Sequence, residues 1–143
     1  MLRSIGGVIA GVLVGALIVY VAEAVGHSIF PPPAGVDLKD PEALKSVMGE
    51  IPLGAKIAVV IGWFAGVLGG GVAALLIAGR WAPVAWVVAA TLFAMAGISL
   101  MAIPHPLWMV VGAIVATLAG GFGAIRLTKA GYARPAPRPK PGL

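Results

Sequence analysis

Residues 5–25 read IGGVIAGVLVGALIVYVAEAV, an apolar run in which Glu23 is the only charged side chain. About 20 apolar residues are enough for a helix to cross the hydrocarbon core of a bilayer. Three more runs of this kind follow, at about residues 53–78, 84–103 and 107–127. The sequence therefore predicts an all-α fold, a bundle of four transmembrane helices that forms one membrane domain over about residues 1–130.

The overall composition also favours a membrane protein. Of the 143 residues, 60% are hydrophobic and 10% are charged, and the mean hydropathy is +1.04. Such a chain uses the lipid bilayer as its solvent and first partner. The lack of cysteine excludes disulfides, thiolate metal sites, iron–sulfur clusters and a cysteine nucleophile. The net charge of +5 comes from basic residues scattered along helix ends, so nucleic acid is not an expected partner.

The first run has one competing interpretation, a secretory signal peptide. Ala22-Glu23-Ala24 loosely resembles a small-residue cleavage site. The apolar run is, however, longer than the core of about 7 to 15 residues that is usual in such signals. We therefore interpret it as a transmembrane helix that stays in the protein.

The polar segment between Pro31 and Pro52 is predicted to be the first outer loop and to contain a short helix. Asp40-Pro41-Glu42 combines an N-cap, a proline at the first helical position and an acid in the first turn. The spacing of i, i+3, i+4 then places three apolar side chains on one face. These are Leu44, Val47 and Met48, whereas Lys39, Lys45 and Glu50 are expected to face water. An amphipathic helix on the membrane surface is the expected structure.

The positions of lysine and arginine predict the orientation. Seven of the ten fall on one side of the predicted topology, namely Arg3, Arg80, Arg126, Lys129, Arg134, Arg138 and Lys140. Lys39, Lys45, Lys56 and every acid fall on the other side. Because cytoplasmic loops are enriched in positive charge, both termini are expected in the cytoplasm of a multi-pass protein of the bacterial inner membrane. Residues 131–143 are rich in proline and basic residues and are expected to be a disordered cytoplasmic tail.

Small residues recur every four positions in three of the predicted spans. The first span has Gly7, Gly11 and Gly15, the second has Gly62, Gly66, Gly70 and Ala74, and the fourth has Gly112, Ala116, Gly120 and Ala124. Such stripes let helix backbones approach closely in lipid. We expect them to pack the bundle internally. The alternative is that one stripe, most readily Gly62 to Gly71, forms an oligomer or partner interface.

A group of polar and aromatic residues is expected at the outer rim of the bundle. Its members are Glu23, His27, Lys56, His105 and Trp108. His27 follows Glu23 by four residues, so both lie on one face if the helix continues that far. His105 lies between two prolines that interrupt the last two spans. Ionisable residues within membrane segments are candidates for function, because burying them in lipid is costly.

Three hypotheses account for this rim cluster. In the first, Glu23 pairs with Lys56 and the histidines bond to loop carbonyls, so the cluster only joins the outer ends of the helices. In the second, His27, His105 and Glu23 hold a metal or a small ligand, because imidazole and carboxylate suit zinc, copper or iron. No close-spaced pair such as HxxxH supports a metal, and the sequence requires no cofactor. In the third, Glu23 is the titrating group of a proton-coupled transporter.

The position of Glu23 weighs against the transporter hypothesis. Small multidrug transporters are four-helix chains with an essential glutamate near the middle of the first span. Here the middle of the first span is at about Val14 and Gly15, and Glu23 lies about two turns nearer the outside. No known catalytic motif occurs in the chain, so we do not expect an enzyme.

Three segments carry a resemblance to other proteins: EAVGHSIFPPP at 23–33, PLGAK at 52–56 and IPHPLW at 103–108. Together they resemble a group of small, uncharacterised four-helix bacterial membrane proteins with EAxGHxxFP and PHPxW segments. The resemblance covers about residues 1–130. It implies the four-helix topology and an outer position for these segments, and it implies no catalytic role.

These observations lead to one main functional hypothesis and two alternatives. The glycine stripes favour a structural or accessory membrane protein that packs as a homo-oligomer or within a larger membrane complex. The first alternative is a metal-binding or small-ligand-binding membrane protein with its site at the outer rim. The second is a small proton-coupled transporter that works as an oligomer.

Overall fold

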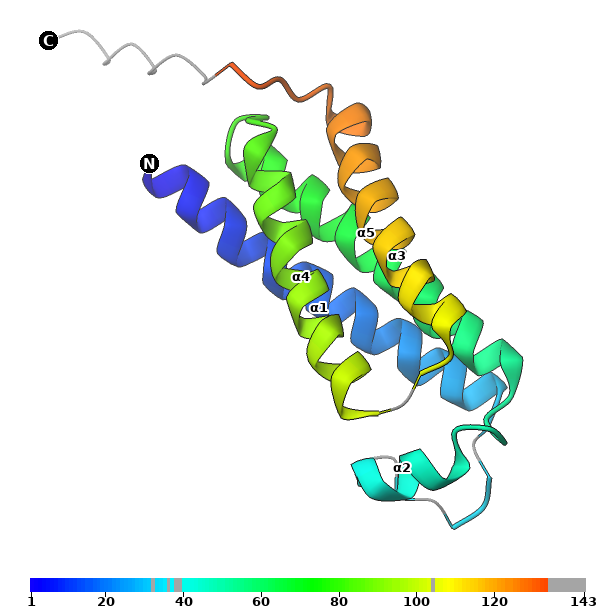
Figure 1. Ribbon diagram of the computed structural model, residues 1–143. Coiled ribbons are helices and arrows are strands. Elements are labelled where there is room, and N and C mark those ends of the chain that lie inside the picture. Colours follow the sequence, from blue (N-terminus) through cyan, green and yellow to red (C-terminus); the bar gives the residue numbers. More distant parts are fainter. Residues whose placement is uncertain (32, 36, 38–39, 104, 134–143) are drawn as a thin grey trace, which may run out of the picture.

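The computed structural model describes residues 1–31, 33–35, 37, 40–103 and 105–133 and consists of five helices (Figure 1). Their bounds are α1 Leu2–Ile29, α2 Pro41–Val47, α3 Leu53–Ile77, α4 Pro83–Ala102 and α5 Leu107–Thr128. The described residues form no β-strand. Of the five helices, α1, α3, α4 and α5 are long and apolar enough to cross a membrane. The predicted all-α fold with four membrane spans is therefore confirmed.

The first helix is longer than the apolar run predicts, because it continues to Ile29. Two hydrogen bonds close its last turns: Phe30 N donates to Gly26 O at 2.8 Å, and Ser28 Oγ donates to Val25 O at 2.8 Å. Backbone bonding within a helix needs no apolar side chains, so a polar end can extend an apolar span. As a result, Glu23 and His27 belong to one continuous helix.

The loop between α1 and α3 contains the short helix α2, which begins at the segment Asp40-Pro41-Glu42. The Asp40 carboxylate accepts a hydrogen bond from Glu42 N at 3.0 Å, which makes Asp40 the N-cap. Lys45 Nζ and Glu42 Oε1 form an ion pair at 2.7 Å one turn further on. The position of this helix on the membrane surface stays a prediction, and Lys39 lies outside the described residues.

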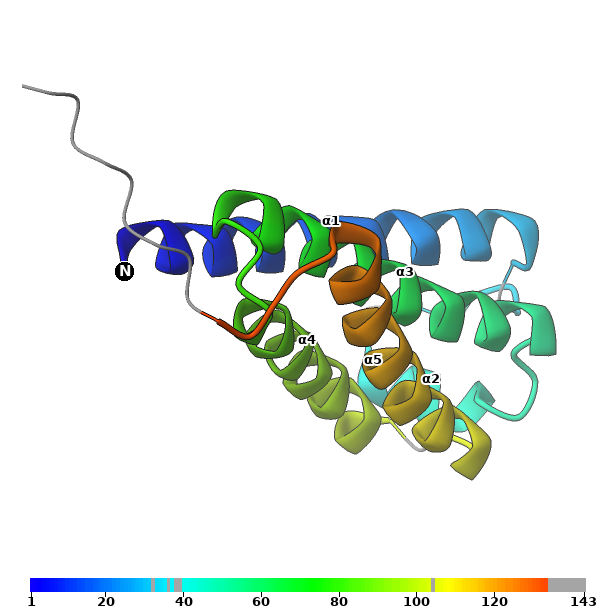
Figure 2. The same cartoon turned by 90° about the horizontal axis from the view of Figure 1, so that it is seen from above.

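The four long helices run back and forth, so the chain ends share one side of the bundle (Figures 1 and 2). The start of α1, the α3–α4 turn and the end of α5 lie at one end, and α2 and the α4–α5 connection lie at the other. This arrangement agrees with an even number of membrane crossings. Which end faces the cytoplasm stays a prediction from the charge pattern.

The segment after α5 is attached to the α3–α4 turn. Ala82 N donates to Gly131 O at 2.8 Å, and Gly131 N donates to Arg80 O at 3.1 Å. Trp86 Nε1 donates to the Tyr132 hydroxyl at 3.1 Å. The chain is thus held to the bundle beyond residue 131, where the sequence predicts the disordered tail to begin. The rest of that predicted tail, residues 134–143, lies outside the described residues.

Helices α1 and α3 approach so closely that their small residues cannot be enlarged. A Cβ atom built on Gly15 would lie 2.8 Å from Gly66 O. One built on Gly11 would lie 2.6 Å from Gly70 O and 2.8 Å from the Cβ of Ala74. Close backbone approach through small residues drives helix association in lipid. The stripes of the first and second spans therefore pack against each other.

The glycine-dense stripe of α3 is covered on two sides within the chain. Gly62, Gly66, Gly70 and Gly71 are all buried. A Cβ atom on Gly71 would lie 2.8 Å from the Cβ of Ala124 on α5. The alternative in which Gly62 to Gly71 forms an oligomer interface is therefore wrong, because α1 and α5 already occupy this surface. The α5 stripe is internal as well, since Gly120 and Ala116 are buried and Gly112 faces Val60 on α3.

The packing is tighter at the end that carries the chain termini. A large cluster of buried residues fills that end, including Ala74, Leu75, Ala82, Ala85, Val88 and Ala124, each with no exposed surface. The cluster toward the α2 end is smaller and consists of Trp63, Met109, Ala113 and Ala116. Space is therefore left between the helices in the half of the bundle near α2.

The close α1–α3 contact yields a stability prediction. The variant Gly11→Val places methyl groups against the Gly70 carbonyl and Ala74, so its free energy of unfolding should fall by roughly 1–3 kcal/mol. The control Gly6→Val carries the same side chain one and a half turns earlier, where a Cβ atom meets nothing within 4 Å. Unfolding in mixed detergent micelles measures both. Equal losses in the two variants would contradict the close contact.

Candidate functional site

Two adjoining cavities lie in the half of the bundle near α2. The outer cavity, of about 240 Å³, is lined by Glu23, His27, Leu44, Met48, Ile51, Ala55, Lys56, Val59, Trp63, Ser99, Ile103, His105 and Met109. The inner cavity, of about 290 Å³, is lined by Ala16, Val19, Tyr20, Glu23, Trp63, Val67, Leu92, Phe93, Met95, Ala96, Ser99, Ala113 and Thr117. Three residues, Glu23, Trp63 and Ser99, line both cavities. We call them the junction residues.

The outer cavity brings together four of the five residues predicted at the rim. Glu23, His27, Lys56 and His105 all line it. Trp108 does not, and 41% of its surface is exposed. Trp108 stands in the first turn of α5 at the same end but outside the cavity, because that turn directs the next residue, Met109, into the bundle.

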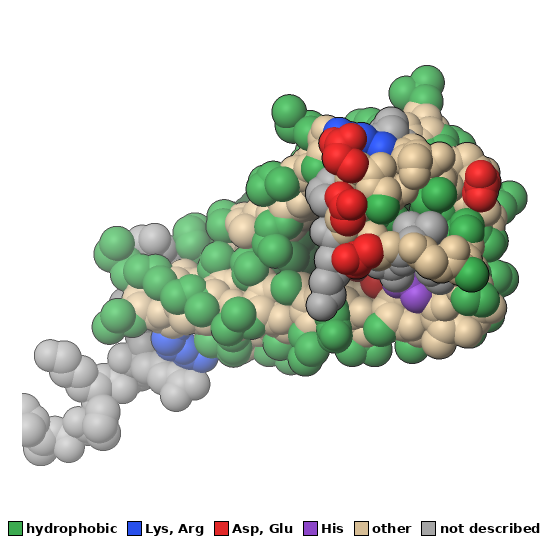
Figure 3. Space-filling view, turned by 90° about the horizontal axis from the view of Figure 1, so that it is seen from below, with side chains coloured by type: hydrophobic (Ala, Val, Ile, Leu, Met, Phe, Trp, Pro, Cys, Tyr) green, Lys and Arg blue, Asp and Glu red, His purple; other side chains and the backbone are tan. Residues whose placement is uncertain are grey.

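The acidic residues of the loop lie apart from the outer cavity. Asp37, Asp40, Glu42 and Glu50 are exposed, and none of them lines either cavity. Figure 3 shows acidic side chains at the surface of this end of the molecule, with a histidine visible on the same face. Glu23 is therefore the one acid of the chain that a molecule in the cavities would meet.

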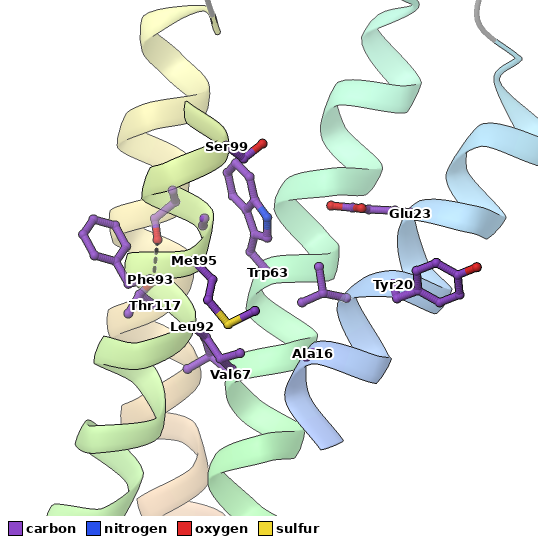
Figure 4. Close-up of a pocket in the computed structure, with 13 residues that line it drawn as sticks. Ala16, Tyr20, Glu23, Trp63, Val67, Leu92, Phe93, Met95, Ser99 and Thr117 are labelled. Atoms are coloured by element: carbon purple, nitrogen blue, oxygen red, sulfur yellow. Dashed lines mark hydrogen bonds between the residues drawn. The ribbon is translucent and has the colours of Figure 1, made fainter. Parts of the chain in front are cut away.

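Two of the junction residues come directly after a close contact between α1 and α3. A Cβ atom on Gly62 would lie 3.0 Å from the Cβ of Ala22. Glu23 follows Ala22 on α1, and Trp63 follows Gly62 on α3, so each is one residue away from this contact. Figure 4 shows the Glu23 side chain extending from α1 toward Trp63. The small residues at the contact thus bring the carboxylate and the indole to the same level of the bundle.

The third junction residue, Ser99, comes from α4 near the α2 end of the bundle. Figure 4 shows Ser99 above Trp63 and Met95 reaching between the helices from the same helix. In the same view the rings of Tyr20 and Phe93 lie at the edges of the inner cavity. The inner cavity is therefore a mainly apolar space, with Glu23, Trp63 and Ser99 at its junction with the outer cavity and the hydroxyl groups of Tyr20 and Thr117 elsewhere on its wall.

The junction residues have polar groups without partners in the described part of the chain. The Glu23 carboxylate forms no ion pair or hydrogen bond there, although it interacts electrostatically with His27. Trp63 is 7% exposed, and its indole N–H donates to no described residue. The Ser99 hydroxyl also lacks a partner among the described residues.

Other hydroxyl groups in the long helices behave differently from Ser99. Thr91, Thr117 and Thr128 each donate to the carbonyl four residues earlier, at 2.9, 2.8 and 2.8 Å. This bond within the helix is the usual way to satisfy a hydroxyl group in lipid. Ser99 makes no such bond, so its hydroxyl remains available to a molecule in the cavities.

The predicted ion pair between Glu23 and Lys56 is wrong. Within the described residues the only ion pair joins Lys45 and Glu42, so the Glu23 carboxylate and the Lys56 ammonium are too far apart to pair. The two residues stand on different helices with the outer cavity between them. His105 does bond to a loop carbonyl, since its Nδ1 lies 2.8 Å from Ile103 O.

The predicted metal site is also wrong in this arrangement. Among the residues described, no group of three or more His, Cys, Asp or Glu side chains is placed to hold a metal ion. His27 and Glu23 belong to α1, whereas His105 lies in the α4–α5 connection and is turned toward Ile103 O. The three predicted ligands share a cavity without converging on one point.

Sequence reasoning missed Trp63, Ser99 and Met109. A signal for two of them was present in the sequence. Trp63 is a tryptophan deep within a predicted span, whereas Trp81 and Trp108 lie at span ends, where tryptophan is common. Ser99 is the only serine inside any of the four predicted spans. Nothing in the sequence distinguished Met109 from the other apolar residues of its span.

Comparison with known proteins gave no matching family model, no similar curated protein and no similar solved structure. Function is therefore inferred from the chemistry of the two cavities. The junction presents a carboxylate acceptor, an indole donor and a hydroxyl group that can do either. Beside it lies an apolar space inside the membrane domain. This combination suits a ligand with one polar end and one apolar end.

The lack of a partner for Glu23 predicts how its replacement changes the free energy of unfolding. Replacing Glu23 with leucine removes a carboxylate that has no partner in the described residues, so the free energy of unfolding should stay equal or rise. The control His105→Leu removes the hydrogen bond to Ile103 O and should lower that free energy by about 1 kcal/mol. Unfolding in mixed micelles compares them. A clear loss of stability in Glu23→Leu would show that Glu23 has a structural role instead.

Proposed function

We propose that the protein is a multi-pass protein of the bacterial inner membrane that binds a small amphiphilic molecule in the outer half of its bundle. The observation that carries the proposal is the group of three unpaired polar side chains at the junction of the two cavities. In the low dielectric of a membrane domain, a polar group without a hydrogen-bond partner costs free energy. A bound molecule that supplies those partners recovers that free energy.

The size and lining of the cavities support ligand binding. Their volumes are about 290 and 240 Å³ and they adjoin at the junction, whereas ligand pockets commonly measure roughly 300–1,000 Å³. Val19, Val67, Leu92 and Met95 give the inner cavity apolar walls. The outer cavity adds His27, Lys56 and His105. An amphiphile could therefore place its apolar part inside and its polar part at the junction.

The packing favours binding over passage through the bundle. Beyond the inner cavity, the large buried cluster that includes Ala74, Leu75 and Val88 occupies the core of the bundle. These side chains have no exposed surface. A transporter would need to open this close-packed region, and close-packed protein interiors resist being opened. We therefore propose a binding role in which the ligand enters and leaves from one half of the membrane.

The accessory role favoured by the sequence has less support in this arrangement. That hypothesis was motivated by the glycine stripes, one of which could have faced a second copy or another protein. In the structure those of α1, α3 and α5 pack against one another within the chain. Assembly into a homo-oligomer or a larger complex would have to use the apolar outer surface of the bundle.

A pair of alanine variants tests the proposed function. Ala96 lines the inner cavity, whereas Ala94, on the same helix, lines neither cavity and is exposed. Ala96→Leu should fill the inner cavity and abolish the retention of a bound small molecule, and Ala94→Leu should leave it unchanged. Mass spectrometry of small molecules extracted from the purified proteins measures retention. Identical extracts from both variants, or no retained molecule in the unmodified protein, would contradict the proposal.

A further inference from the structure

The charges that face the two cavities are distributed unequally. Of the described residues that line the inner cavity, Glu23 alone has a charged side chain. The outer cavity has the same carboxylate and, in addition, Lys56. A molecule in the inner cavity therefore meets a single negative charge, and a molecule near the rim meets one charge of each sign. In a medium of low dielectric, this difference strongly favours a positive group at the inner side of the junction.

The side chain next to Glu23 also suits a positive group. Trp63 is 7% exposed and lines both cavities together with Glu23, whose side chain extends toward it (Figure 4). The face of an indole ring attracts cations, most strongly when water is excluded. A carboxylate beside a buried tryptophan is a combination that recognises amines and quaternary ammonium groups.

From these observations we propose that the ligand is an organic cation with an apolar or aromatic body. Its positive group lies between Glu23 and Trp63, and its body occupies the inner cavity against Val67, Leu92 and Met95. The Ser99 hydroxyl accepts a hydrogen bond where the cation has an N–H to donate. This inference rests on the proposed function, because it assigns a chemical class to the molecule that the cavities bind.

An anionic ligand fits the same residues less well. Its negative group would have to sit at Lys56, which lies in the first turn of α3 at the rim. The long apolar stem of lysine also lets its ammonium reach water at the membrane surface. An anion whose body fills the inner cavity would place its charge close to the unpaired Glu23 carboxylate, and like charges repel strongly there.

Three probes of one shape test the sign of the charge. Phenyltrimethylammonium, tert-butylbenzene and benzenesulfonate each carry a phenyl ring with one tetrahedral substituent, which is positive, neutral and negative in turn. Their dissociation constants are measured by calorimetry on the full chain in a non-ionic detergent at about pH 8, where carboxylates are usually ionised and imidazoles neutral. We expect phenyltrimethylammonium to bind at least about tenfold more tightly than the neutral probe, because of its interaction with Glu23 and Trp63.

A matched pair of variants assigns the effect to one carboxylate. Glu23→Gln should weaken phenyltrimethylammonium binding by at least about tenfold and leave tert-butylbenzene binding unchanged. Glu50→Gln makes the same chemical change at an exposed loop residue that lines neither cavity and should have no effect. An unaltered circular dichroism spectrum and thermal transition show that Glu23→Gln is folded.

Different failures separate this inference from the proposed function. If the neutral probe binds as tightly as the cation and Glu23→Gln changes neither, the cation assignment is overturned while ligand binding stands. If benzenesulfonate binds most tightly and loses affinity in Lys56→Gln, the ligand is an anion and the assignment is again overturned. If none of the three binds and no small molecule is retained by the purified protein, both proposals fail.

Discussion

The close approach of α1 and α3 is the contact on which the rest of the structure depends. Lipid offers no hydrophobic gain for bringing two apolar helices together, so their association needs backbone contact through small residues. Gly11 and Gly15 of α1 meet Gly70 and Gly66 of α3 with no room for a side chain. Because α1 and α3 run alongside each other, the contact at these glycines also determines which residues of the two helices face each other further along.

That register creates the candidate site near the α2 end. The same series of contacts continues through Ala22 and Gly62, and the residues that follow them, Glu23 and Trp63, come to the same level of the bundle, where both line the two cavities. At the opposite end a third cavity, of about 330 Å³, lies near the starts of α1 and α4, and its described lining holds no charged side chain. The polar junction therefore distinguishes the two cavities near α2 from the third.

The polar groups at the junction are used differently from those in the rest of the bundle. Elsewhere, the hydroxyl groups of Thr91 and Thr117 donate to carbonyl groups of their own helices. In α2, Lys45 and Glu42 form an ion pair. At the junction, a carboxylate, an indole N–H and a hydroxyl lack partners among the described residues. No fully buried side-chain nitrogen or oxygen of the described residues lacks a hydrogen bond, and Ser99 is an exposed residue, so these three groups have open space beside them. Their concentration at one point between two cavities is the reason to regard that point as functional.

The sequence by itself determined the number of membrane helices, since a helix must satisfy its backbone within lipid and about 20 apolar residues are needed to cross it. It also predicted that Glu23, His27, Lys56 and His105 lie at one end of the bundle. Consecutive spans run in opposite directions, and these four residues stand at or near span ends that fall on the same side. Only the tertiary structure decided that Glu23 lines the two cavities with Trp63 and forms no ion pair with Lys56, and that the glycine stripes of α1, α3 and α5 face one another. Those choices depend on the rotation of each helix about its axis, which is set by contacts between residues distant in sequence.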